Sequence, residues 1–208
     1  VYWPIMNYLR PGMLEREVAM ELEQLLRKKG ADKASFEVIV ASGPRSSMPH
    51  ARAGERLIRE GDLVLLDYGA SYRGYCADLT RTVVVGRPDP RQEEVYALVL
   101  EAREAALAAI APGVKAGEVD AAAREVISSR GLGESFGHPV GHGVGLAVHE
   151  EPRVGPDSEE VLEAGMVFTV EPAVYIPGWG GVRVEDVVQV TDRGYRVLSS
   201  SPRDFLAL

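Results

Sequence analysis

The chain has 208 residues, of which 46% are hydrophobic and 26% charged, enough to bury a sizeable core as one domain. Its formal net charge of -8, without a block dense in Lys or Arg, argues against nucleic acid as a partner. The absence of an apolar run long enough to span a bilayer or of a visible signal sequence, together with a single cysteine, Cys76, predicts a cytoplasmic protein without membrane contact.

The chain opens with a predicted turn and helix. Val1–Leu9 come first, and Pro4 disfavours a helix interior in this short segment. The turn at Pro11-Gly12 then starts a helix that we expect to end at Gly30.

A predicted hairpin follows. The apolar run Leu63–Gly69 is typical of a buried strand, and after a short turn a second strand is expected over Tyr75–Val85. The hairpin would bring Asp67 and Asp78 together. A carboxylate taken out of water stays charged only if it is paired or bound to a metal.

The second half repeats this order of features. A helix is predicted over Glu93–Ile110 from its helical periodicity and its content of Ala, Leu and Glu. Pro112-Gly113 and Gly131 then recur 101 positions after Pro11-Gly12 and Gly30. A second predicted hairpin carries Glu171 and Glu185, which gives the chain two matching pairs of acids.

Because several features keep their order and near-constant spacing, we interpret the chain as a single domain with an internal duplication. The halves are expected at about 1–110 and 111–208, facing each other across a pseudo-twofold axis so that the four acids meet. The first half lacks room for a counterpart of the helix that precedes Pro112-Gly113, and the chain starts without Met. We therefore expect a preceding N-terminal domain that is absent from this chain.

His142 lies between the acid pairs, in the glycine-rich segment Gly141–Gly145. The segment lacks the lysine and the full spacing of the usual phosphate-binding loops. A plain loop histidine is the alternative to a metal ligand. Four carboxylates and one imidazole suit Mn, Co, Zn or Fe, and their four negative charges would balance two divalent ions. Without metal these acids would repel one another.

Several motifs together resemble the "pita-bread" metallopeptidases, which comprise methionine aminopeptidases, Xaa-Pro aminopeptidases and Xaa-Pro dipeptidases. The resemblance covers essentially the whole chain. It implies an α+β fold with two pseudo-symmetric half-domains around a curved antiparallel sheet. The motifs are Leu65–Gly69, Ala77–Thr82, Gly141–Gly145, Val148–Glu150, Thr169–Pro172 and Val182–Asp186.

The resemblance also implies roles for the five candidate ligands. Asp67 would bind one metal, His142 and Glu171 the other, and Asp78 and Glu185 would bridge both. A hydroxide between the metals would attack the peptide bond, with Glu171 as the general base.

Further residues match the outer ring of that family's site. His50 and His149 correspond to histidines near the substrate, and His138 to one characteristic of the proline-specific branch. Each could instead be an ordinary structural histidine. Thr80 and Arg183 are expected to orient the carboxylates, although Arg183 could equally form a simple salt bridge.

The segments His138–His142 and Val174–Asp186 resemble the proline-specific enzymes. We therefore predict a metallopeptidase that hydrolyses the Xaa-Pro bond of short peptides with two divalent ions and that forms a homodimer. Mn and Co are the preferred ions, and Zn and Fe are the alternatives. The sequence fits an aminopeptidase and a dipeptidase equally. A methionine aminopeptidase and a non-catalytic binding module with the same fold are the alternatives.

Overall fold

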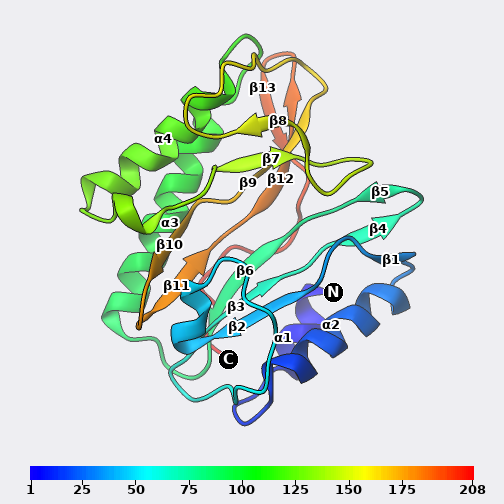
Figure 1. Ribbon diagram of the computed structural model, residues 1–208, viewed down its shortest axis with the longest axis vertical. Helices are drawn as coiled ribbons and strands as arrows, with labels where there is room; N and C mark the ends of the chain where they lie inside the picture. Colours follow the sequence, from blue (N-terminus) through cyan, green and yellow to red (C-terminus); the bar gives the residue numbers. More distant parts are fainter.

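The computed structural model describes residues 1–208 and contains four α-helices and thirteen short strands (Figure 1). The helices are α1 (Tyr2–Tyr8), α2 (Glu15–Lys28), α3 (Pro90–Ala108) and α4 (Ala116–Ser129). The strands of the first half are β1 (Lys33–Ala34), β2 (Ile39–Ser42), β3 (Leu63–Asp67), β4 (Ala70–Tyr72), β5 (Tyr75–Cys76) and β6 (Thr80–Val84). Those of the second half are β7 (Gly141–Gly143), β8 (Glu150–Val154), β9 (Val167–Val170), β10 (Ala173–Ile176), β11 (Gly180–Arg183), β12 (Asp186–Thr191) and β13 (Gly194–Val197). Two short 3-10 helices cover Gly43–Ser47 and Gly133–Ser135.

The strands form small antiparallel sheets with helices on their outer sides. The sheet orders are β2-β3-β6, β1-β4-β5, β10-β11 and β13-β12-β9-β7-β8. Helix α2 contacts β1 and β2, whereas α3 contacts β9 to β11 and α4 contacts β8 (Figure 1). Helix α3 therefore packs on strands of the second half although its residues precede position 111. The chain is therefore α+β with antiparallel pairing, as predicted.

The first turns of α3 and α1 follow from their residues. Asp89 caps α3 by accepting from the backbone N–H of Gln92, and Pro90 occupies the first helical position, where its missing N–H is not needed. The segment Val1–Leu9, in which Pro4 was expected to disfavour a helix interior, forms the short helix α1. Pro4 lies in the first turn of α1, where an N–H has no intrahelical partner, so the ring is tolerated.

The two halves repeat local details as well as elements. Helix α2 and helix α4 start 101 positions apart and have the same length. An isolated antiparallel bridge joins Leu14 to Leu57, and its counterpart joins Lys115 to Val161. The glycines of the two Pro-Gly turns have the same positive φ of 88°, a conformation that L side chains rarely adopt.

Both predicted hairpins exist, but their strands are interrupted. The expected strand Tyr75–Val85 is divided into β5 and β6, with Asp78 in the gap. The pairing keeps one register on either side, since Asp67 lies opposite Thr80 and Ser71 opposite Cys76. The hairpin is thus one ribbon bent at Asp78.

The second hairpin bends in the same way. Pro172, which has no N–H to donate, follows Glu171 in the gap between β9 and β10, and Glu185 lies in the gap between β11 and β12. Register continues across the bend, from Val170 opposite Asp186 to Ala173 opposite Arg183. Glu171 and Glu185 therefore face each other across the bent ribbon.

Two apolar clusters hold the halves together. One packs α1 and α2 against β2, β3 and β6, and the other packs α3 and α4 against the second-half strands. Strand β3 contributes to both, because Leu65 faces one cluster and Leu66 the other. None of the helices has the length and hydrophobicity needed to cross a membrane.

Candidate metal centre

The bends in the two ribbons place all four acids around one cavity. Asp67 ends β3, and Asp78, Glu171 and Glu185 occupy the three strand gaps described above. Together with His142 on β7 they line a cavity of about 600 Å³. Acids from both halves thus converge at or beside the breaks in strand pairing.

Glycines allow the ribbons to approach this closely. A Cβ added to Gly69 would lie 1.9 Å from the carbonyl oxygen of Ala77, and one added to Gly141 would lie 1.8 Å from that of Thr169. A Cβ on Gly143 would lie 2.1 Å from the carbonyl oxygen of Glu151. Each glycine is next to a candidate ligand or two residues from it. A larger residue at these positions would push apart the strands that carry the ligands.

Asp78, His142 and Glu185 each offer a ligand atom within 4.8 Å of the others. The Nδ1 atom of His142 is 3.0 Å from the carbonyl oxygen of Gly143, to which it can donate only if it carries the proton. Nε2 faces Glu171, whose Oε1 is 3.3 Å away, and Asp78, whose Oδ2 is 3.8 Å away. Without a metal, a proton on Nε2 would join it to Glu171, and the hydrogen bond to Glu171 raises the pKa of His142 against the effect of burial; with a metal bound, Nε2 would offer its lone pair instead. A proton on Nδ1 and none on Nε2 is the tautomer that a metal-binding imidazole requires.

Three carboxylate oxygens at this centre are buried without a hydrogen-bond partner in the protein: Asp67 Oδ1, Asp78 Oδ1 and Glu185 Oε1. Buried acceptors of this kind are costly, and one from each of three converging acids is unusual. A divalent cation would satisfy them, so the residues present fit a metal.

The charges at the centre perturb one another. Burial and then the neighbouring carboxylates raise the pKa values of Asp78 and Glu185 well above their usual range. Burial alone would also raise the pKa of Glu171, but its hydrogen bond with His142 and the nearby His138 and Arg183 lower it to about 2. Crowded carboxylates with raised pKa values are typical of a functional site.

Arg183 is buried beside the acids and binds several groups at once. It donates to Asp67 Oδ2 from Nη2, to Thr80 Oγ1 from Nε over 2.9 Å, and to the Tyr175 hydroxyl from Nη1 over 2.7 Å. Thr80 in turn donates to Glu185 Oε2 over 2.6 Å. Thr80 and Arg183 therefore touch carboxylates of both halves, which goes beyond a simple salt bridge.

The three remaining histidines line the same cavity. His138 is engaged at both ring nitrogens, by the carbonyl oxygen of Pro139 at 2.7 Å and the Tyr175 hydroxyl at 3.2 Å. Burial lowers the pKa of His138, so the ring is neutral at neutral pH. His50 and His149 are exposed at the cavity, and the ring of His149 lies 4.2 Å from that of His142.

The structure adds residues that sequence reasoning missed. Tyr175 links Arg183 to His138, and Thr169 donates to Glu171 Oε1 while accepting from the His142 backbone N–H, each over 3.1 Å. Both lie on strands carrying recognised motifs, but a hydroxyl in an apolar strand is no strong signal by itself.

Comparison with known proteins fits this geometry. Residues 3–192 match the sequence profile of metallopeptidase family M24. The chain belongs to that family. Family M24 membership implies divalent metal ions, and the α+β pita-bread fold expected from the sequence is confirmed.

The chain is similar to several M24 proteins of known structure or name. The Xaa-Pro dipeptidase of Pyrococcus furiosus is 49% identical over 195 residues, covering 94% of this chain and 56% of that protein. An Xaa-Pro dipeptidase structure from Bacillus anthracis gives a TM-score of 0.98 at 48% identity, covering 100% of this chain and 58% of that one. An X-Pro aminopeptidase structure from Thermotoga maritima gives a TM-score of 0.97 at 42% identity, covering 100% of this chain and 59% of that one. The chain thus spans less than two thirds of the length of these relatives.

Proposed function

We propose that the chain forms the catalytic domain of a peptidase that hydrolyses the Xaa-Pro bond of short peptides with two divalent ions, Mn or Co. One observation carries the proposal. Four carboxylates from two bent ribbons converge with the Nε2 atom of His142 on one cavity, and three of their oxygens lack any partner in the protein. The similarity to relatives named as Xaa-Pro dipeptidase and X-Pro aminopeptidase supports the proline-specific branch.

The five candidate ligands divide the work as follows in this proposal. Asp67 would hold one ion, His142 and Glu171 would hold the other, and Asp78 and Glu185 would take part in holding both. Bound divalent ions supply an activated water and stabilise the charge that develops on the attacked carbonyl. Four carboxylates balance the four positive charges of the two ions.

Side chains of this chain would transfer protons and donate hydrogen bonds during hydrolysis. Glu171 would be ionised as a ligand of the bound ions, and its carboxylate can accept the proton of the attacking water. Thr169 orients one of its oxygens, because the Thr169 hydroxyl donates to Glu171 Oε1 over 3.1 Å. His50 and His149, exposed at the cavity, can donate to the substrate carbonyl and to the leaving nitrogen.

We also propose that the cavity prefers short peptides. Phe36, Ile39 and Pro139 give it an apolar part that suits a proline ring. Its two arginines differ, because Arg183 is buried and fully engaged, whereas Arg153 is exposed and lies opposite His142 across the β7–β8 pair. Arg153 is thus placed to bind the free carboxylate of a dipeptide.

We also propose that the two half-domains arose by duplication. The equal lengths of α2 and α4, their separation of 101 positions and the paired bridges at Leu14 and Lys115 support this origin. The duplication explains why each half supplies one bent ribbon with two acids. We also propose a preceding N-terminal domain and a homodimer.

A peptide panel tests the activity. Metal-stripped protein, with Mn²⁺ or Co²⁺ restored, is given an Xaa-Pro dipeptide, an Xaa-Pro tripeptide and a Met-Ala-Ser peptide. The proposal predicts metal-dependent release of amino acid from proline peptides only. Cleavage of the methionine peptide alone would instead favour a methionine aminopeptidase, and no cleavage with two ions bound would favour a binding module.

A further inference from the structure

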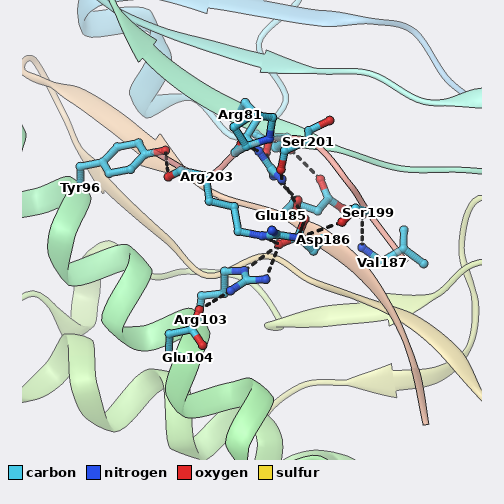
Figure 2. A network of polar contacts seen from close by, with 12 residues as sticks. Arg81, Tyr96, Arg103, Glu104, Glu185, Asp186, Val187, Ser199, Ser201 and Arg203 are labelled. Carbon is cyan, nitrogen blue, oxygen red and sulfur yellow. Dashed lines mark hydrogen bonds and ion pairs between the residues drawn. The ribbon is translucent and has the colours of Figure 1, made fainter. Parts of the chain in front are cut away.

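A buried carboxylate directly beside the centre plays no part in the chemistry above. Asp186 follows Glu185 in the chain, begins β12 and is fully buried. Three arginines bind it, as Figure 2 shows: Arg81 Nη2 donates to Oδ1 over 2.8 Å, and Arg103 Nε and Arg203 Nε donate to Oδ2 over 2.7 Å each.

The three arginines come from separate parts of the fold. Arg81 is on β6, Arg103 on α3, and Arg203 in the C-terminal segment. Tyr96 ties that segment down, since its hydroxyl donates to the Arg203 carbonyl and its ring stacks on Phe205. Asp186 is therefore the point where both halves and the chain end meet.

Three arginines around the single carboxylate of Asp186 are not explained by folding stability alone. Burying charges costs free energy that a well-packed apolar group avoids, so buried ionic clusters are poor stabilisers in themselves. Their best-attested use is to specify one arrangement of the chain. The contacts of Arg81 indicate which arrangement is specified here.

Arg81 is the arginine of this cluster that reaches the metal centre. Its Nη1 donates to the carbonyl oxygens of Thr80 and Glu185, and its other nitrogens bind the carbonyls of Ser201 and Pro202. Thr80 and Glu185 are themselves linked by the Thr80 hydroxyl and by the bond from the Glu185 N–H to the Thr80 carbonyl. Arg81 thus fixes the backbone at the two ribbon bends that face each other. The hydrogen bonds of Arg103 and Arg203 reach neither residue.

We propose that Arg81 and Asp186 are positioning residues that hold the Glu185 carboxylate in its metal-binding orientation by fixing the backbone of Glu185 and Thr80. This rests on the proposed function of Glu185 as a ligand. Asp186 holds the guanidinium of Arg81 in place, and Arg81 in turn holds the backbone carbonyls of Thr80 and Glu185. The C-terminal segment takes part because its carbonyls complete the binding of Arg81.

Matched arginine variants test the proposal. Arg81→Lys and Arg103→Lys each keep a buried positive charge beside Asp186, but only the first breaks the link to Glu185. We expect Arg81→Lys to weaken Mn²⁺ binding about 10- to 100-fold by calorimetry and to change the visible spectrum of the Co²⁺-loaded protein. Arg103→Lys should lower the Tm of the metal-free protein while keeping Mn²⁺ affinity within about threefold and the Co²⁺ spectrum unchanged.

Equal losses of metal affinity in the two variants, or a lowered Tm with unchanged affinity in Arg81→Lys, would overturn the proposal and leave the cluster a purely structural role. If Arg81→Lys does not fold, Asp186→Asn carries the test, with the same loss of affinity expected. Metal binding by the wild-type protein distinguishes a failure of the proposed function from a failure of this inference. Wild-type protein that binds no Mn²⁺ refutes the proposed function, whereas normal binding with an unaffected Arg81 or Asp186 variant refutes only this inference.

Discussion

Gly141→Ala should disable the centre without touching any ligand. The new Cβ would lie 1.8 Å from the Thr169 carbonyl oxygen and 3.1 Å from Thr169 Oγ1. Real Cβ contacts are not shorter than 3.0 Å, so β7 and β9 must separate by at least 1.2 Å. That shift breaks the 3.1 Å hydrogen bond from the His142 N–H to Thr169 and moves the imidazole away from Glu171.

The magnitude follows from the size of the shift. Overpacking of this kind costs about 1 to 3 kcal/mol of unfolding free energy. In a domain of this size that lowers the Tm by about 2 to 12 °C. A displacement of about 1 Å at a catalytic group can cost about 100-fold in rate. Activity should therefore fall far more than stability does.

Gly137→Ala is the matched control, because a Cβ at Gly137 meets nothing within 4 Å and its φ is not positive. It should leave Tm equal or slightly higher. Both variants would be compared by thermal unfolding, by bound metal per chain and by hydrolysis of an Xaa-Pro dipeptide. Wild-type metal content and activity in Gly141→Ala would refute the argument that glycine is needed for strand approach.

Three further predictions concern the centre itself. Glu171→Gln should lower kcat about 10²- to 10⁴-fold with Tm nearly unchanged, and near-normal turnover would refute its role as base. Arg153→Gln should raise KM about tenfold or more for an Xaa-Pro dipeptide but not for its amide, and equal effects on both would contradict carboxylate binding. The raised pKa values of Asp78 and Glu185 mean that the metal-free fold keeps protons there and loses stability as pH rises through those values, whereas bound metal replaces the protons. The gain in Tm on adding Mn²⁺ should therefore be larger at about pH 8 than at about pH 6, and the same gain at both would be contrary to this reasoning.

The sequence predicted the parts of this site that depend on local pattern. Short apolar runs ending in acids placed Asp67 and Glu171, and the shared spacing of the two halves placed Asp78 and Glu185 beside them. The resemblance to a known family added the outer histidines, and all of them line the same cavity. The acids needed only nearby residues or a repeated motif, and the histidines needed the family resemblance.

The bends and the cluster behind them could not be predicted in this way. The strand Tyr75–Val85 was expected to be continuous, and its interruption around Asp78 lies beside the close approach of Gly69 to Ala77 across the ribbon. Arg81 and Asp186 do stand out as charges in apolar strands. Their partners, Arg103 and Arg203, are 83 and 17 positions from Asp186, a pairing that only the fold reveals.

Titration of metal-stripped protein with Mn²⁺, beside the Asp78→Asn variant, tests the central claim most directly. We predict about two ions per wild-type chain and about one or fewer in the variant, because Asp78 is proposed to contact both ions. Binding of no ion by the wild type, or of two ions irrespective of Asp78, would contradict the assignment of this cavity as a two-metal centre.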